Sequence, residues 1–167
     1  TTVAQDASMQ DVVFFLGGGL SPQLTDGKCK KMKTDWANMQ NVFTHFCALT
    51  DAQINAVLAI SDVTYAAYRD FPNSSNMLTK VAALKRPIIV SEGYLMAERT
   101  RAYRLGEVAK EGDHDDIART INRMIAEDYF DELRSCAQWD EYHALHGADR
   151  LPDCFSKLLC CEDSNAK

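Results

Sequence analysis

No apolar run in this sequence approaches the roughly 18–20 residues that a membrane-spanning helix needs, since the longest candidates are residues 12–16 and 88–90. No segment has a clear surplus of lysine and arginine either. Residues 1–49 carry four acids and four bases, residues 50–112 carry seven acids and eight bases, and residues 113–167 carry thirteen acids and six bases. Because polyanions are bound through surplus basic side chains, we expect no nucleic-acid partner. With no transmembrane segment, membrane association would be peripheral, through a membrane complex.

A strand pattern is also missing. No stretch shows sustained alternation of apolar and polar residues, which marks a half-buried strand. The sequence contains no repeat at solenoid periods and no linker that would separate two domains. Its 167 residues are 46% hydrophobic and 25% charged, which is an ordinary globular composition. Together these features favour one all-α domain.

Apolar residues at steps of three and four predict the clearest helix over residues 28–49. They are Cys29, Met32, Trp36, Met39, Phe43, Phe46 and Cys47. Thr50 and Gln53 then match a capping box, in which two side chains satisfy free N–H groups at a helix start. The second helix begins there, and its predicted inner side consists of Ile54, Val57, Leu58, Tyr65 and Tyr68.

Further helices are predicted over residues 77–84, from Pro87 to Lys110 with Gly93 as a weak point, and from Asp113 through Tyr142, with a short last one at 154–161. Short connections between long helices favour antiparallel neighbours. We therefore predict a compact antiparallel helical bundle of four long helices plus short ones. Its predicted organisation is an extended, loop-rich N-terminal arm at 1–27, a bundle domain at 28–161 and a disordered tail at 162–167.

The six cysteines allow fifteen complete pairings. They are Cys29, Cys47, Cys136, Cys154, Cys160 and Cys161. On the predicted helix, Cys29 and Cys47 lie about 27 Å apart at 1.5 Å per residue, too far for a disulfide. A bridge between the adjacent Cys160 and Cys161 is strained. In every remaining pairing, Cys29 and Cys47 each bond a C-terminal cysteine, so the bundle is predicted to be disulfide-stapled.

Such staples belong outside the reducing cytosol. We therefore expect a secreted protein or one of an organelle lumen, processed from a precursor. Buried free thiols are the alternative state of the cysteines. A zinc site is disfavoured because the sequence has no Cys-x-x-Cys pair.

Motifs that carry catalysis are absent. The run Gly17-Gly18-Gly19 lacks the lysine and the serine or threonine of a phosphate-binding loop. His143 and His146 are three residues apart and suit one metal ion, but they also fit the end of a helix. The acids around His114, in residues 113–116, are explained by the positive end of a helix dipole. The analysis of the residues therefore assigns no catalytic residue, no metal ligand and no cofactor.

Arginine and tyrosine, which protein interfaces enrich, cluster in one predicted helix. This candidate interface consists of Tyr94, Arg99, Arg101, Tyr103 and Arg104. The leading hypothesis is a non-catalytic helical interaction protein, an accessory or peripheral subunit that binds other protein subunits of a larger assembly.

Two alternatives remain open at this point. In the first, the bundle carries a small apolar ligand in a cavity lined by the methionines and aromatic residues of 32–46. In the second, the protein is a small metal-dependent enzyme that uses the histidine pair 143/146 or the acidic cluster 113–116.

Overall fold

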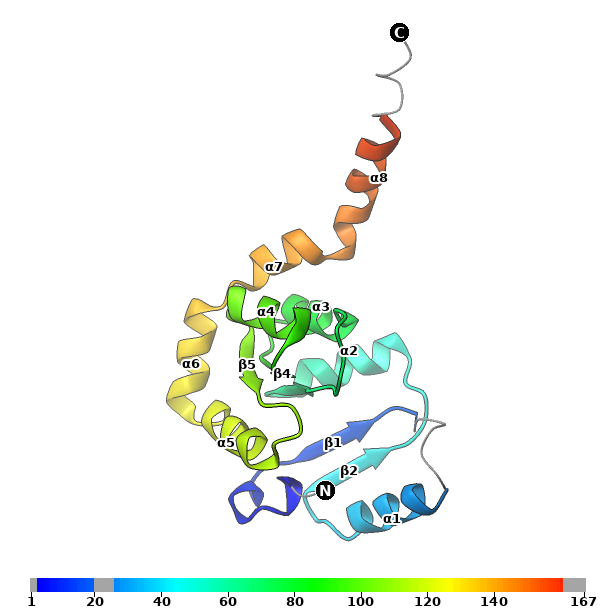
Figure 1. The fold of residues 1–167 in the computed structure, drawn as a ribbon, viewed down its shortest axis with the longest axis vertical. Coiled ribbons are helices and arrows are strands. Elements are labelled where there is room, and N and C mark those ends of the chain that lie inside the picture. Colours follow the sequence, from blue (N-terminus) through cyan, green and yellow to red (C-terminus); the bar gives the residue numbers. More distant parts are fainter. Residues whose placement is uncertain (1–2, 20–25, 161–167) are drawn as a thin grey trace.

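The structure is a computed structural model that describes residues 3–19 and 26–160 (Figure 1). Its first half contains the 3-10 turns η1 (Val3–Gln5) and η2 (Ala7–Met9), then β1 (Phe14–Gly17), α1 (Asp26–Ala37), β2 (Val42–His45), α2 (Asp51–Ile60), β3 (Thr64–Ala66) and α3 (Asn76–Ala83). The second half contains β4 (Ile88–Ser91), α4 (Tyr94–Ala102), β5 (Gly106–Ala109), α5 (His114–Met124), α6 (Glu127–Cys136), α7 (Trp139–His146), η3 (Ala148–Arg150) and α8 (Leu151–Cys160).

The strands form two parallel sheets. In the smaller sheet β1 pairs with β2, with Phe14 opposite Val42. In the larger sheet β4 lies between β3 and β5, with Ile88 opposite both Thr64 and Gly106. Successive strands within a sheet are joined through helices, which is the connection that parallel strands require.

The prediction of an all-α bundle is therefore wrong. Each described strand has only three or four residues, too few to show alternation. In β4, Ile88, Ile89 and Val90 are all fully buried, because helices cover both faces of a parallel sheet. Such a strand is a continuous apolar run rather than an alternating one, and a short apolar run does not distinguish a strand from a buried helix.

The predicted helix 28–49 is two elements joined by a turn. α1 ends at Ala37, and the chain then turns into β2. At that turn the Asn41 side chain donates hydrogen bonds to the carbonyl oxygens of Met9 and Val12, at 3.0 and 3.2 Å. The apolar spacing continues through the turn by coincidence, and Phe43 in β2 is 57% exposed.

The predicted helix from Pro87 to Lys110 is also wrong, since Pro87 leads directly into β4. Gly93 adopts φ +76° and precedes α4, which ends at Ala102 before β5 begins. Local signals elsewhere hold. The capping box of Thr50 and Gln53 is confirmed at the start of α2, and α3 forms where the short helix was predicted.

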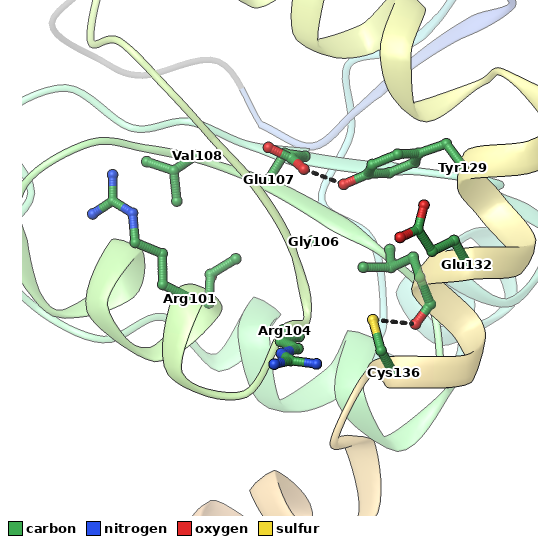
Figure 2. Close-up of a pocket in the computed structure, with 10 residues that line it drawn as sticks. Arg101, Arg104, Gly106, Glu107, Val108, Tyr129, Glu132 and Cys136 are labelled. Carbon is green, nitrogen blue, oxygen red and sulfur yellow. Dashed lines mark hydrogen bonds between the residues drawn. The ribbon is translucent and has the colours of Figure 1, made fainter.

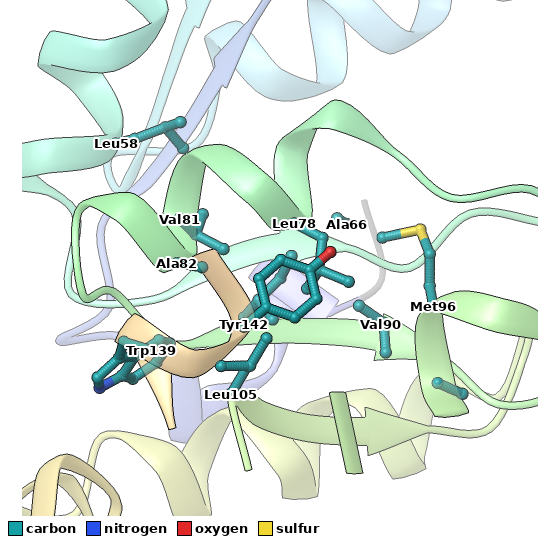
Figure 3. Packing of buried hydrophobic residues seen from close by; sticks show 12 residues of the cluster. Leu58, Ala66, Leu78, Val81, Ala82, Val90, Met96, Leu105, Trp139 and Tyr142 are labelled. Carbon is teal, nitrogen blue, oxygen red and sulfur yellow. The ribbon is translucent and has the colours of Figure 1, made fainter. Parts of the chain in front are cut away.

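The core has two parts, one on each face of the larger sheet. Side chains from β3, β4, α2, α3, α4 and α7 form the first part, shown in Figure 3, with Tyr142 and Leu78 fully buried at its centre. α5 and α6 cover the other face, where Ile89 packs with Ile121 and Met124. The long helix predicted from Asp113 is thus three helices, α5, α6 and α7, which pack on different faces of the sheet.

The ends of the described chain also differ from the expected arm and bundle. Residues 3–17, predicted as part of a loop-rich arm, form two 3-10 turns and a strand, and Met9 is fully buried against α5. Figure 1 shows α8 extending away from the rest of the molecule. None of the described helices is long and apolar enough to cross a membrane. The predicted tail at 162–167 lies outside the described residues.

Candidate functional site

The strongest concentration of polar groups lies where the strands of the larger sheet end. Residues 67–75, 91–94 and 110–113 lie at the carboxyl ends of β3, β4 and β5, and we call these three segments the carboxyl edge. Because the strands are parallel, α3, α4 and α5 all begin at this edge. A helix start exposes unbonded N–H groups and the positive end of the helix dipole, so it favours anions. The start of α5 already carries Asp113, Asp115 and Asp116, so the starts of α3 and α4 are the ones suited to a negatively charged ligand.

The loop after β3 brings several donors to the start of α3. The Ser75 hydroxyl accepts a hydrogen bond from the Met77 N–H at 3.1 Å, which caps the helix. The Tyr68 hydroxyl lies 3.4 Å from the same Ser75 oxygen. From α4, the Arg99 guanidinium donates to the Ser74 hydroxyl at 2.9 Å. A guanidinium, two serine hydroxyls and a tyrosine hydroxyl are therefore grouped at one helix start.

Asp70 ties the three segments of the carboxyl edge together. Its N–H donates to a Glu111 carboxylate oxygen at 3.1 Å, and its own carboxylate accepts from the Tyr94 hydroxyl at 2.9 Å. That hydrogen bond, with the charge of Asp70, raises the pKa of Tyr94. Asp70 and Tyr94 both have positive φ, 45° and 54°. Non-glycine residues held in this conformation store strain and cluster at functional sites.

Arg69 adds a second guanidinium to the edge. It lies over Gly112, where a built Cβ would come 3.1 Å from the Arg69 Nη2 atom. Gly112 also has φ +72°, so both its conformation and the nearby guanidinium favour glycine. Arg69 makes no hydrogen bond or ion pair within the part of the chain that the structure describes, so its donors are available to a ligand.

The acidic cluster at 113–116 has a structural role at the same edge. Asp113 accepts a hydrogen bond from the Asp116 N–H at 3.0 Å and caps α5. Asp116 accepts from the Lys110 N–H and from Arg119, and these two donors, the Lys110 N–H first, lower its pKa. These carboxylates hold the end of β5 and the start of α5 in place through hydrogen bonds. Across the residues that the structure describes, no group of three His, Cys, Asp or Glu side chains is placed to hold a metal ion.

A separate cavity of about 400 Å³ opens between β5 and α6 (Figure 2). It lies at the amino end of β5, away from the carboxyl edge. Its Glu107 carboxylate already accepts hydrogen bonds from Tyr129 and Arg123. Burial first, and then the hydrogen bond to Glu107, raises the pKa of Tyr129. These hydrogen bonds hold Glu107 in place, and Arg101 and Arg104 add two guanidiniums to the lining of the cavity.

The five residues of the candidate interface do not form one patch. Tyr94 belongs to the carboxyl edge and the Arg99 side chain reaches it at the Ser74 hydroxyl, whereas Arg101 and Arg104 line the cavity at the other end of β5. Tyr103 is half-buried, with its ring 5.2 Å from that of Tyr142. A protein-binding role for any of them stays a prediction.

The other predicted sites are distributed as follows. His146 packs against the Tyr142 ring at 4.7 Å, and burial first, then the charges of Arg99 and Arg150, lower its pKa. Of the expected ligand-cavity stripe, Trp36 stacks on Phe46 at 5.7 Å. The predicted bundle that would enclose such a cavity does not exist.

The disulfide staples are contradicted as well. Cys47, Cys136 and Cys154 carry free thiols. The predicted cysteine pairings depend on one helix over 28–49. In the structure Cys29 lies in α1, whereas Cys47 follows β2. Cys160 is the last residue of α8, and Cys161 lies outside the described residues.

Most of the carboxyl edge carries no signal in the sequence. The spacing of apolar residues places Tyr68 on the inner side of a predicted helix, and Arg69, Asp70 and Glu111 match no motif. One signal was available: the apolar run 88–90 is followed at once by Ser91, Glu92 and Gly93. An apolar run that ends in turn residues is typical of a buried parallel strand.

Comparison with solved structures shows where this fold recurs. The chain is similar to WaaG, a glycosyltransferase involved in lipopolysaccharide biosynthesis, with a TM-score of 0.64 and 14% identity over 90% of this chain. It is also similar to a sucrose-phosphate synthase from Thermosynechococcus elongatus, with a TM-score of 0.56 and 16% identity over 93% of this chain. The chain spans 41% of the length of each of these proteins.

Searches at the level of sequence give no relative. No protein-family model matches the chain, and no curated protein matches it. The structural likeness establishes a mixed α/β fold with parallel sheets, resembling the Rossmann-like fold of glycosyltransferases. This fold overturns the expectation of a non-catalytic helical accessory subunit and of a ligand-carrying helical bundle.

Proposed function

We propose that this chain is the donor-binding part of a glycosyltransferase, and that its carboxyl edge binds a sugar donor whose leaving group carries phosphate. The observation that carries the proposal is that the starts of α3 and α4 meet Arg69 and Arg99 at one edge of a parallel sheet. In open parallel α/β sheets, ligands bind outside the carboxyl ends of the strands. One of the two similar proteins is a glycosyltransferase and the other is a sucrose-phosphate synthase, which supports a sugar donor over other phosphate ligands.

The side chains of the edge divide into groups that suit different parts of such a donor. The guanidiniums of Arg69 and Arg99 and the N–H groups at the start of α3 complement phosphate oxygens. The carboxylates of Asp70 and Glu111 accept hydrogen bonds, as the hydroxyls of a sugar or ribose require. These carboxylates already fix the loops through the Asp70 N–H and the Tyr94 hydroxyl, so the edge is organised before a ligand arrives.

The same groups suit the chemistry of glycosyl transfer. In that reaction the bond between the anomeric carbon and the phosphate oxygen breaks, a bond to the acceptor oxygen forms, and negative charge develops on the departing phosphate. Fixed cations and N–H groups aimed at that charge stabilise the transition state without reorganising during the reaction. The acceptor-binding part and the proton-accepting group are not assigned to any residue of this chain.

The proposal is tested by isothermal titration calorimetry at low salt with UDP-glucose, ADP-glucose and GDP-mannose as probes, and with UDP to measure the contribution of the phosphates. Arg69→Ala and Arg99→Ala each remove one guanidinium. A hydrogen bond to a charged group contributes about 1.5–3 kcal/mol. We therefore expect each variant to bind the preferred probe about ten- to a hundredfold more weakly.

Arg104→Ala is the matched control, because it removes the same charge at the amino end of β5, beside the cavity. We expect this variant to bind like the unmodified chain. Absence of binding for every probe, or a greater loss in Arg104→Ala than in Arg69→Ala, would refute donor binding at the carboxyl edge.

A further inference from the structure

The five described strands form two parallel sheets rather than one, and their order is informative. The chain passes outward from β1 to β2 in the smaller sheet, then returns and passes outward from β3 through β4 to β5 in the larger one. This is the winding of a doubly wound sheet, in which the chain starts near the centre and reverses direction once. The centre lies between β1 and β3.

Two common strand orders place the centre differently. In the order 2-1-3-4-5, strand 1 pairs directly with strand 3. Here β1 pairs with β2 alone and β3 with β4 alone, so the central pairing of that order is absent. The other common order is 3-2-1-4-5-6. If its first strand is removed and the rest are renumbered, the pairs 2-1 and 3-4-5 remain, which are the two sheets of this structure.

The backbone of both edge strands is directed as this second order requires. The N–H groups of Phe14 and Gly18 donate to β2, to the carbonyls of Asn41 and His45. Because backbone groups alternate in direction along a strand, the Phe15 amide points away from β2. By the same reasoning, the Thr64 N–H bonds Pro87 before β4, and the Tyr65 amide points away from β4.

The two edges belong to one region of the molecule. Phe14 of β1 and Val63, which precedes β3, both pack against the cluster around Ile89 of β4. Figure 1 shows β1 on the side of its sheet nearer to the larger sheet. A parallel sheet is normally covered on both faces, yet Phe15 is 43% exposed and Tyr65 is 53% exposed. Both edge strands therefore carry a large exposed aromatic side chain and an unpaired row of backbone groups, which proteins ordinarily protect.

We infer that the space between β1 and β3 is a slot for one further β-strand, which runs parallel to both and joins the two sheets into one. Neighbouring strands lie about 4.8 Å apart, so a seated strand would separate β1 and β3 by about 9.6 Å. Its residues would be apolar on both faces, with β-branched side chains favoured, because the strand would be central. By the handedness of parallel crossovers, an occupant joined covalently to this chain would be a strand followed by a helix that connects to η1 and η2 ahead of β1.

This inference does not depend on the proposed sugar donor, since it concerns strand pairing and is measured without a ligand. A filled slot would also place the end of a new strand beside the carboxyl edge, at the point where the strand order reverses. Ligands of doubly wound sheets bind at that point. The added strand would therefore be a neighbour of the carboxyl edge and is separate from the residues that form it.

The first test uses the chain as it is, with amide hydrogen exchange followed residue by residue by NMR. We expect the Phe15 and Tyr65 amides to exchange at least about a hundredfold faster than those of Phe14 and Thr64, which are hydrogen-bonded. Equal protection of Phe15 and Tyr65 would mean that β1 pairs directly with β3, and would overturn the inference.

The second test fills the slot. A designed strand–loop–helix unit is joined ahead of Thr1, and the control unit carries proline at the middle of its strand, which removes a ladder hydrogen bond. We expect the Phe15 and Tyr65 amides to slow together by at least about tenfold with the designed unit and not with the proline control. Slowing at one edge only, or at neither, would overturn the inference. Weak binding of every sugar-donor probe would leave this result unchanged.

Discussion

The absence of a side chain at Gly106 allows β5 to approach β4 closely. Its replacement by alanine therefore tests the packing of these two strands in the larger sheet. Gly106 has φ +155°, a conformation that side chains rarely adopt. A methyl group built there overlaps the carbonyl oxygen of Ile88 and lies 2.7 Å from the Ile88 nitrogen. Both atoms are backbone, so no side-chain rotation relieves the contact. The strands must separate, and this separation disturbs the hydrogen bond from the Ile88 N–H to the Leu105 carbonyl, now 3.2 Å.

The cost follows from these two effects. A side chain in this region of φ costs about 1–3 kcal/mol, and each disturbed hydrogen bond costs about 1 kcal/mol. We therefore expect Gly106→Ala to lower the free energy of unfolding by roughly 2–4 kcal/mol, against roughly 5–15 kcal/mol for a whole domain. With a urea m-value of about 1–3 kcal/mol/M, the unfolding midpoint falls by at least about 0.7 M.

The assay is urea unfolding followed by circular dichroism, with Gly27→Ala as the control. Gly27 lies in the first turn of α1, and no described atom lies within 4 Å of its built Cβ. Alanine there should leave stability unchanged or raise it by up to about 1 kcal/mol. If Gly106→Ala and Gly27→Ala unfold at the same urea concentration, the close approach of β4 and β5 is refuted.

Two further predictions concern local interactions. Thr50→Ala removes the cap of α2, in which the Thr50 hydroxyl accepts a hydrogen bond from the Gln53 N–H at 3.3 Å. We expect this variant to lower the free energy of unfolding in urea by about 1 kcal/mol. An unchanged unfolding midpoint would show that the cap does not form in solution. The pKa of His146 lies below its usual 6.5, because burial and then the charges of Arg99 and Arg150 disfavour the protonated ring. The contribution of the neutral ring to stability is therefore present at neutral pH and is lost as the pH falls through that lowered pKa. Proton NMR titration of the His146 ring should give a midpoint below 6.5, His146→Gln should reduce the loss of stability on acidification, and a midpoint above 6.5 would contradict the burial of this ring.

Local signals in the sequence were reliable where a few neighbouring residues determine the structure. The Thr50–Gln53 capping box, a helix start at Asp113 and the short helix predicted over 77–84 are all present, because each depends on hydrogen bonds within one turn. The absence of a cation-rich segment is likewise a property of composition alone.

The prediction of the fold class was wrong because tertiary contacts determine whether the short apolar segments form strands or helices. Ile88, Ile89 and Val90 are buried by helices that come from both sides of the sheet, and nothing within those three residues distinguishes a strand from a helix. The Met39–Phe43–Phe46 spacing continued a helical period across a turn that Asn41 holds through the distant Met9 and Val12 carbonyls. Once α4 and β5 were merged into one helix, the carboxyl edge could not be assembled, because its residues meet only through parallel pairing.

The central claim is that a sugar donor binds at the carboxyl edge. The most direct measurement is a two-dimensional ¹H–¹⁵N NMR titration of the chain with UDP-glucose and the other donor probes. We expect the largest chemical-shift changes at residues 67–77, 91–94 and 110–113, on the three segments that Asp70 joins. Shifts confined to Arg104, Glu107 and Tyr129 around the other cavity, or no shifts with any donor, would contradict this claim.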